Sequence, residues 1–230
     1  MQADGIPWRR LAAEAVVIVA SVYLAIVLEG QAQDRERAEE ATAALAQLLD
    51  ELREDQADIG EIREEQENLA GDYRALLGWF AEPTSMSADS VQASLDQIVT
   101  SNRTMFPRSS AWTTMVAAGQ LTELGNPGLV TRLGNLYENI NDRLVYNGEY
   151  YDSDLSAFAF GSLSSMWDTQ TKRLLTGDPR ELAAFRNRLR FMYLGWNQYY
   201  LALLDEYEAE VEGLITGVGE HLDERDWKSP

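Results

Sequence analysis

The chain starts with a short polar stretch and then enters a long apolar segment. Leu11 to Leu28 reads LAAEAVVIVASVYLAIVL, with a single charge at Glu14. A helix of about 20 apolar residues, rising about 1.5 Å per residue, crosses the hydrocarbon layer of a membrane. We therefore predict a transmembrane helix over residues 11–28, preceded by a short cytoplasmic tip over residues 1–10 and followed by an acidic domain over residues 29–230.

The residues that flank the apolar segment predict its orientation. Arginines at positions 9 and 10 precede it, and the positive-inside rule keeps such a flank in the cytoplasm. Glu14 lies within one turn of the headgroups and four residues after Arg10, which limits the cost of its charge. Ser21 and Tyr23 give the segment polar groups that a neighbouring helix can bind. The predicted membrane anchor comprises Trp8, Arg9, Arg10, Glu14, Ser21, Tyr23 and Glu29.

A cleaved signal peptide is the alternative interpretation of the same segment. The arginines would form its basic region, Ala15 to Leu28 its apolar region, and Gly30 and Ala32 the small residues of a cleavage site. We interpret the segment as a retained anchor. A bacterial inner-membrane protein with a cytoplasmic N-terminus and a periplasmic C-terminal domain is then expected.

Beyond the anchor, apolar residues recur at helical spacing. From Ala38 on, the apolar residues form two neighbouring rows along the predicted helix. One row contains Ala38, Leu45, Leu52, Ile59, Tyr73 and Phe80, and the other contains Ala41, Leu48, Ile62, Leu69 and Leu76. Asp55 and Gln66 interrupt this seam, which favours a helix in a bundle over a long coiled coil. Gly30, Gly60 and Gly71 are the expected bends.

Further helix boundaries follow from capping signals. Gly125-Asn126-Pro127 and Gly177-Asp178-Pro179 each combine a terminating glycine, an N-cap and a first-turn proline. Additional helices are predicted over Ala88–Thr100, Ala111–Leu124, Pro127–Asn147 and Asp154–Leu175, and a long helix after Pro179. Alternation with a period of two is nowhere sustained. The predicted fold is all-α, with the N-terminal transmembrane helix continuing into an antiparallel helical bundle.

Composition narrows the chemistry. The net charge of −19 disfavours nucleic acid as a partner. The chain has no cysteine and a single histidine, His221, so thiolate sites and histidine clusters are excluded. Because the apolar segment contains no histidine, we expect it to ligate neither pigment nor haem. We predict no catalytic residues, no metal site, no cofactor and no enzymatic activity.

One basic region and the aromatic stretch after it are candidates for partner docking. Lys172, Arg173, Arg180, Arg186, Arg188 and Arg190 are concentrated in an otherwise acidic domain. The candidate docking residues are Arg180, Arg186, Arg190, Tyr193, Trp196 and Tyr200. The alternatives are ion pairs between the basic residues and the acidic first helix, and burial of the aromatic residues in the bundle core.

Two stretches of the chain resemble a known family. Glu14 followed by VVIVASVYLAIVLEG, and the block from Ala111 to Tyr137, are similar to a bacterial family of single-span membrane proteins of unknown function with a periplasmic helical domain. In the second block Gly119, Leu121, Asn126, Leu129, Leu133 and Tyr137 carry the resemblance. The resemblance implies an envelope protein with a short cytoplasmic tip, and it implies no activity.

Together these observations favour a non-catalytic accessory subunit. The single span would anchor the chain beside a larger membrane protein complex, and the acidic bundle would brace that complex on its periplasmic side. A respiratory or photosynthetic assembly is one context that fits. The alternative is an envelope sensor or ligand-binding bundle that holds a small molecule between its helices and acts through a partner protein.

Overall fold

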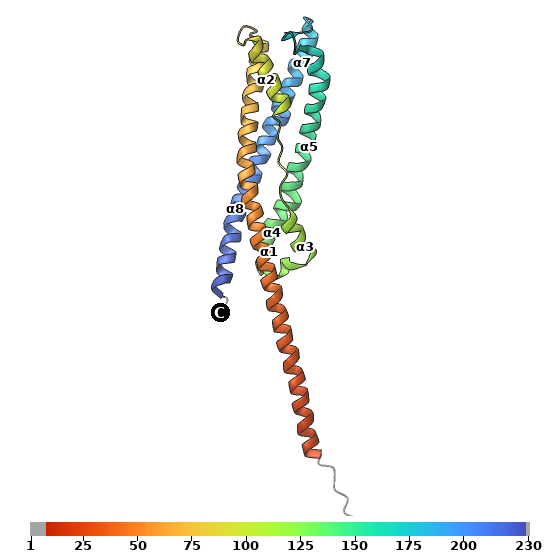
Figure 1. The fold of residues 1–230 in the computed structure, drawn as a ribbon, viewed down its shortest axis with the longest axis vertical. Helices are drawn as coiled ribbons and strands as arrows, with labels where there is room; N and C mark the ends of the chain where they lie inside the picture. The colour runs from red at the N-terminus through yellow and green to blue at the C-terminus, as the bar shows by residue number, and fades with distance from the viewer. Residues whose placement is uncertain (1–7, 229–230) are drawn as a thin grey trace, which may run out of the picture.

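The computed structural model describes the backbone of residues 8–228 and the side chains of Glu14 and of residues 16–225. Its dominant element is α1, a single helix of 74 residues from Trp8 to Ala81. Figure 1 shows that the first part of α1 projects far beyond the bundle and that the rest of it belongs to the bundle. None of Gly30, Gly60 and Gly71 interrupts the helix.

The other elements pack along the second half of α1 in an up-down-up-down order (Figure 1). The second column contains α2 (Ala88–Thr100), an extended segment over residues 101–109, α3 (Ser110–Ala117) and the 3₁₀ helix η1 (Gln120–Leu124). The third contains α4 (Pro127–Asn135), α5 (Asn141–Ala157) and α6 (Ser164–Met166), joined by the π-helical turns η2 (Leu136–Ile140) and η3 (Phe158–Leu163). The fourth contains α7 (Pro179–Phe191), the π-helical turn η4 (Met192–Asn197) and α8 (Gln198–Lys228). The all-α prediction is confirmed.

The core lies where the predicted rows of apolar residues meet the other columns. Leu45, Leu52, Ile59 and Tyr73 of α1 are fully buried and pack in one continuous cluster with residues of α2, α5 and α8. Helix α8 is the main neighbour of α1. The helical period of the first half of the sequence therefore identifies the core-facing side of α1 correctly.

Both predicted N-caps are confirmed, whereas the predicted terminating glycine Gly177 ends no helix, because extended chain precedes it. Asn126 Oδ1 accepts a hydrogen bond from the backbone N–H of Leu129, 3.1 Å away, and Pro127 occupies the first turn of α4. Asp178 accepts one from the N–H of Arg180 at 2.8 Å and begins α7. These caps satisfy donors that a helix leaves free at its start.

Three predicted helices are wrong in their extent. The helix predicted over Pro127–Asn147 does not end there, because α5 continues without a break to Ala157. The stretch Asp154–Leu175 does not form one helix, because α6 ends at Met166 and a small antiparallel hairpin follows, with β1 (Trp167–Asp168) paired to β2 (Arg173–Leu174). The side chain of Asp168 accepts hydrogen bonds from the N–H groups of Gln170 and Thr171, which fixes the turn.

The predicted helix Ala111–Leu124 is also divided. Helix α3 ends at Ala117 because Gly119 takes a left-handed conformation with φ of 68°. Only a 3₁₀ turn follows before α4. A glycine at such a position ends a helix at little steric cost.

Candidate functional site

The N-terminal part of α1 that contains the apolar segment, residues 11–28, is called the apolar half. Its described side chains pack against no other element in the described part of the chain. Val16, Val19 and Tyr23 expose 68%, 68% and 70% of their surface, and the segment is long and apolar enough to cross a membrane. Ser21 donates a hydrogen bond to the carbonyl of Val17 at 2.8 Å, so its hydroxyl is satisfied within the helix and does not require a partner. Glu14 and Glu29 are exposed. The side chains of Trp8, Arg9 and Arg10, and the whole of residues 1–7, lie outside the described residues.

A helical stalk separates the apolar half from the bundle. Nearly all residues of 29–40 are exposed, and the first buried residue of the bundle is Ala41. Asp34 and Arg37, one turn apart, form an ion pair at 3.7 Å on its surface. The predicted outer domain, residues 29–230, thus begins as a bare helix and becomes a bundle only after the stalk.

Inside the bundle, the extended segment 101–109 lacks the hydrogen-bond ladder of a helix or strand. Buried side chains supply partners for its backbone instead. The N–H of Met105 donates to the hydroxyl of Tyr200 at 2.6 Å, and the N–H of Arg108 donates to both carboxylate oxygens of Asp55, at 3.2 and 3.1 Å. The carbonyl of Arg103 accepts from Gln66 at 2.9 Å. Buried backbone groups need such partners, so these side chains hold the segment in place.

Asp55 is the centre of the first of two polar clusters. It is fully buried, accepts a hydrogen bond from Arg108 Nη1 at 2.8 Å and one from the Tyr207 hydroxyl at 2.7 Å. Arg108 also reaches Asp58 at 2.8 Å and Glu54 at 2.8 Å. Burial raises the pKa of Asp55 above its usual value, and the hydrogen bonds from Tyr207 and Arg108 oppose that rise.

Gln66 is the centre of the second cluster. Its side-chain oxygen and its backbone carbonyl both accept from Asn197 at 2.9 Å, and its amide nitrogen donates to Asn102 at 3.2 Å. Asn102 in turn donates to Asp152, which also accepts from Thr104 at 3.0 Å. The two residues that interrupt the apolar seam of α1 therefore both bind the extended segment. This role was not predicted from the sequence. Its only signals there are the polar residues at two core positions of α1 and the stretch without helical pattern over residues 101–110.

The basic region around α7 is only partly neutralised. Lys172 pairs with Asp89 of α2 at 2.5 Å, and Arg188 pairs with Asp154 of α5 at 3.4 Å. Arg180, Arg186 and Arg190 are exposed and form no ion pair with any described residue. The expected pairing of this region with the acidic first helix is therefore not found among the described residues, where Glu61 and Asp55 of α1 pair with Arg103 and Arg108 of the extended segment instead.

The three aromatic docking candidates have different environments. Tyr193 is half-buried against Tyr73, with ring centroids 5.9 Å apart. Trp196 is half-buried, stacks on Tyr151 and donates its indole N–H to Asp154 at 2.7 Å. Tyr200 is fully buried and accepts from the backbone of Met105. As a docking residue Tyr200 is a wrong prediction, because its side chain serves the core.

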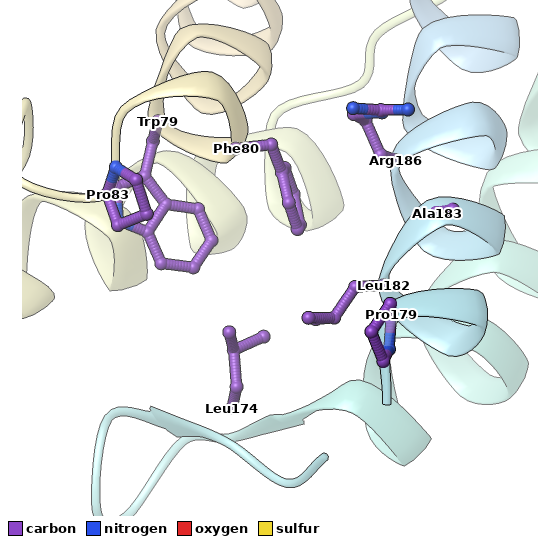
Figure 2. A pocket seen from close by; sticks show the side chains of 8 residues that line it. All are labelled: Trp79, Phe80, Pro83, Leu174, Pro179, Leu182, Ala183 and Arg186. Atoms are coloured by element: carbon purple, nitrogen blue, oxygen red, sulfur yellow. The ribbon is translucent and has the colours of Figure 1, made fainter. Parts of the chain in front are cut away.

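At the far end of the bundle, a cavity of about 340 Å³ opens between the last turn of α1 and the first turns of α7. Figure 2 shows Trp79 and Phe80 from α1 on one side of it, the α7 residues on the other, and Leu174 from β2 below it. Its lining comprises Trp79, Phe80, Pro83, Leu174, Pro179, Leu182, Ala183 and Arg186. Arg186 is the only charged residue of this set. Among the described residues, no group of three or more histidine, aspartate or glutamate side chains is arranged to hold a metal ion.

The sequence matches a known protein family. Residues 14–197 match a family of unknown function (DUF6090). The chain belongs to this family. No curated protein and no solved structure is significantly similar to it.

The DUF6090 match defines which features belong to the shared part of the chain. It begins at Glu14 and so contains most of the apolar segment, the stalk and both polar seam residues. It ends at Asn197, the partner of Gln66, and so includes the extended segment, the cavity and the arginines of α7. Helix α8 follows the match and completes the core from outside it.

Proposed function

We propose that this member of DUF6090 is a non-catalytic accessory subunit of a larger membrane protein complex. In this proposal the apolar half of α1 crosses a bacterial inner membrane, and the bundle lies on the periplasmic side. The observation that carries the proposal is the continuity of α1, since one helix contains both the exposed apolar segment and the central column of the bundle.

A continuous helix fixes both the height and the direction of the bundle. From Glu29 to Ala81 α1 extends about 80 Å at about 1.5 Å per residue. The stalk alone accounts for roughly 18 Å of this length. Because the chain carries a net charge of −19, anionic headgroups repel the bundle and favour a position away from the membrane surface. In this proposal the continuous helix α1 holds the surface of the bundle at a set distance from the bilayer.

The surface that best fits a partner is the exposed basic face of α7. Arg180, Arg186 and Arg190 lack ion-pair partners among the described residues, although acidic residues are twice as numerous as basic ones in the chain. Unpaired arginines are suited to carboxylates on another protein, where they guide association and orientation. Half-buried Trp196 and Tyr193 follow α7 directly in η4 and leave part of their aromatic surface accessible.

A charge-reversal experiment tests the proposal. The tagged full-length chain is produced at native level, extracted in mild detergent and analysed for stoichiometric partners by mass spectrometry. We expect a defined complex with the unaltered chain, and its loss with Arg180→Glu, Arg186→Glu and Arg190→Glu combined. The matched control reverses Arg35, Arg37 and Arg53, which are exposed on α1, and gives the same net charge.

The outcomes separate clearly. Loss of the complex only in the α7 variant supports docking through that face. Equal loss in both variants attributes the effect to net charge and contradicts the proposed surface. Recovery of the unaltered chain as a lone monomer at native level contradicts the accessory-subunit function itself.

A further inference from the structure

The cavity between α1 and α7 has the character of a ligand site. Seven of its lining residues are apolar or proline, and its one charged group is the Arg186 guanidinium. In Figure 2 Arg186 extends from α7 toward the side occupied by Phe80, so its charge lies at the edge of the apolar walls. Sites for small molecules are mostly apolar, with a few polar groups that fix orientation.

We propose that this cavity binds a small, water-soluble monocarboxylate with an aromatic or branched apolar body. The body would fill the space between Trp79, Phe80 and Leu182, and the carboxylate would pair with Arg186. Guanidinium groups bind carboxylates through two parallel hydrogen bonds, which gives direction as well as attraction. This inference shares Arg186 with the docking surface proposed above and, for the source of the ligand, rests on the proposed membrane span, whereas the binding test below is read without any partner protein.

The charge of Arg186 supports an anionic ligand. It forms no ion pair with any described residue, whereas its neighbours Lys172 and Arg188 each have an acidic partner. No acidic residue contributes to the lining. Arg186 is exposed, so water screens its charge, and its preference for a carboxylate rests on the geometry of paired hydrogen bonds.

The size of the cavity limits the ligand. Its volume of about 340 Å³ lies near the lower limit of small-molecule sites, which span about 300–1,000 Å³. The cavity is therefore of a size that suits a small molecule. Only eight residues line the space, far fewer than the roughly 20 to 30 residues per side of a standard protein interface. These dimensions favour a small molecule over a segment of a partner protein.

The distance between the cavity and the apolar segment restricts where a ligand of the cavity can come from. Trp79 lies about 75 Å along α1 from Leu28, the end of the apolar segment, at about 1.5 Å per residue. Acyl chains of a bilayer that holds that segment do not reach so far. The ligand must therefore come from the aqueous phase on the side of the bundle.

The test uses the full chain in nanodiscs of phosphatidylcholine, titrated with 4-phenylbutyrate. Its uncharged analogue 4-phenylbutanol has a similar apolar body and lacks the carboxylate. Binding is followed by tryptophan fluorescence, to which Trp79 contributes from the cavity wall, and by the melting temperature, which a bound ligand raises. We expect saturable binding of phenylbutyrate and at least tenfold weaker binding of the alcohol.

Matched variants identify the site. We expect Arg186→Gln to weaken phenylbutyrate binding at least tenfold, and Arg190→Gln, the same change one turn further along α7, to alter it less than twofold. Trp79→Phe should remove most of the fluorescence change and keep the rise in melting temperature. Circular dichroism establishes that each variant is folded, and Arg186→Lys, which keeps the charge, should bind with intermediate affinity.

Several results would overturn the inference. Absence of saturable binding to the unaltered chain would do so directly. Equal binding of acid and alcohol would show that Arg186 does not select a carboxylate. Equal effects of the Arg186 and Arg190 variants would show attraction to net positive charge without a site in the cavity.

Discussion

The apolar half of α1 (residues 11–28) and its bundle half (residues 41–81) share one helix and differ in what surrounds them. In the first half, Val16 and Leu24 expose 68% and 58% of their surface, and no side of the helix is covered. In the second half, Leu48 and Leu52 are fully buried along one face, and the opposite face is charged. An apolar stripe indicates burial against other helices, whereas an apolar surface on all sides is typical of a helix surrounded by a protein core or by a membrane.

The hydrogen-bond partners of polar residues also differ between the two halves of α1. Ser21 of the first half bonds to the carbonyl of its own helix, four residues back. Asp55 and Gln66 of the second half bond to a segment of another column. The hydroxyl of Ser21 is therefore satisfied within its own helix, whereas Asp55 and Gln66 connect α1 to a distant segment of the chain.

The largest expected effect is on the second half of α1. Replacing Asp55 by alanine leaves Arg108 and Tyr207 without their buried partner. Loss of one partner of a buried ion pair costs about 3–5 kcal/mol of unfolding free energy. Chemical denaturation followed by circular dichroism measures it. Glu54→Ala, which removes an exposed partner of the same arginine, should change stability by less than about 1 kcal/mol. Equal effects of the two variants would contradict the central role of Asp55.

A second pair of variants compares leucines of the two halves. Leu52→Ala should destabilise the bundle by about 2–5 kcal/mol, because it opens a cavity in the core. Leu24→Ala should leave unfolding of the bundle unchanged within about 0.5 kcal/mol, because its side chain does not contact the bundle. The same denaturation assay applies to both. A large loss of bundle stability with Leu24→Ala would show that the first half packs against protein.

The pH dependence of the buried carboxylate gives a third prediction. Burial raises the pKa of Asp55, so the folded chain binds its proton more tightly than the unfolded chain does. This contribution to stability is complete below the unfolded pKa of about 3.9 and is lost as pH rises through the folded value. The stability of the unaltered chain relative to Asp55→Asn should therefore fall with rising pH over that range. A relative stability that increases with pH would show that the pairing with Arg108 outweighs burial.

The smallest effect is expected at a helix end. Asn126→Ala removes the side-chain acceptor at the start of α4 and should cost about 0.5–2 kcal/mol. Asn126→Asp keeps an acceptor at that position and should retain most of the stability. Thermal unfolding of the two variants distinguishes them, and an equal loss in both would assign the role of Asn126 to something other than its cap.

Sequence reasoning succeeded where local signals decide the structure. The buried rows of α1 follow from helical periodicity, and the starts of α4 and α7 follow from Asn126 and Asp178. In each case a repeat or a short capping motif carries the information, and no distant residue is needed.

Features that depend on distant contacts were missed. The extended segment 101–109 is held by Asp55, Gln66 and Tyr200, which are far away in the sequence. The π-helical turns η2 and η4 lie within sequences of ordinary helical pattern. The cavity beside Arg186 joins residues from α1, β2 and α7, which only the fold brings together.

The most direct test concerns the location of the two halves of α1. Because the chain contains no cysteine, single cysteines can be placed without background at Ser21, at Gln33 in the stalk and at Ser153 of α5. Bacterial spheroplasts that contain each variant are treated with a membrane-impermeant maleimide. We predict labelling at Gln33→Cys and Ser153→Cys and protection at Ser21→Cys. Protection of both outer positions in intact spheroplasts, or ready labelling of Ser21→Cys, would contradict a membrane-spanning first half that carries an external bundle.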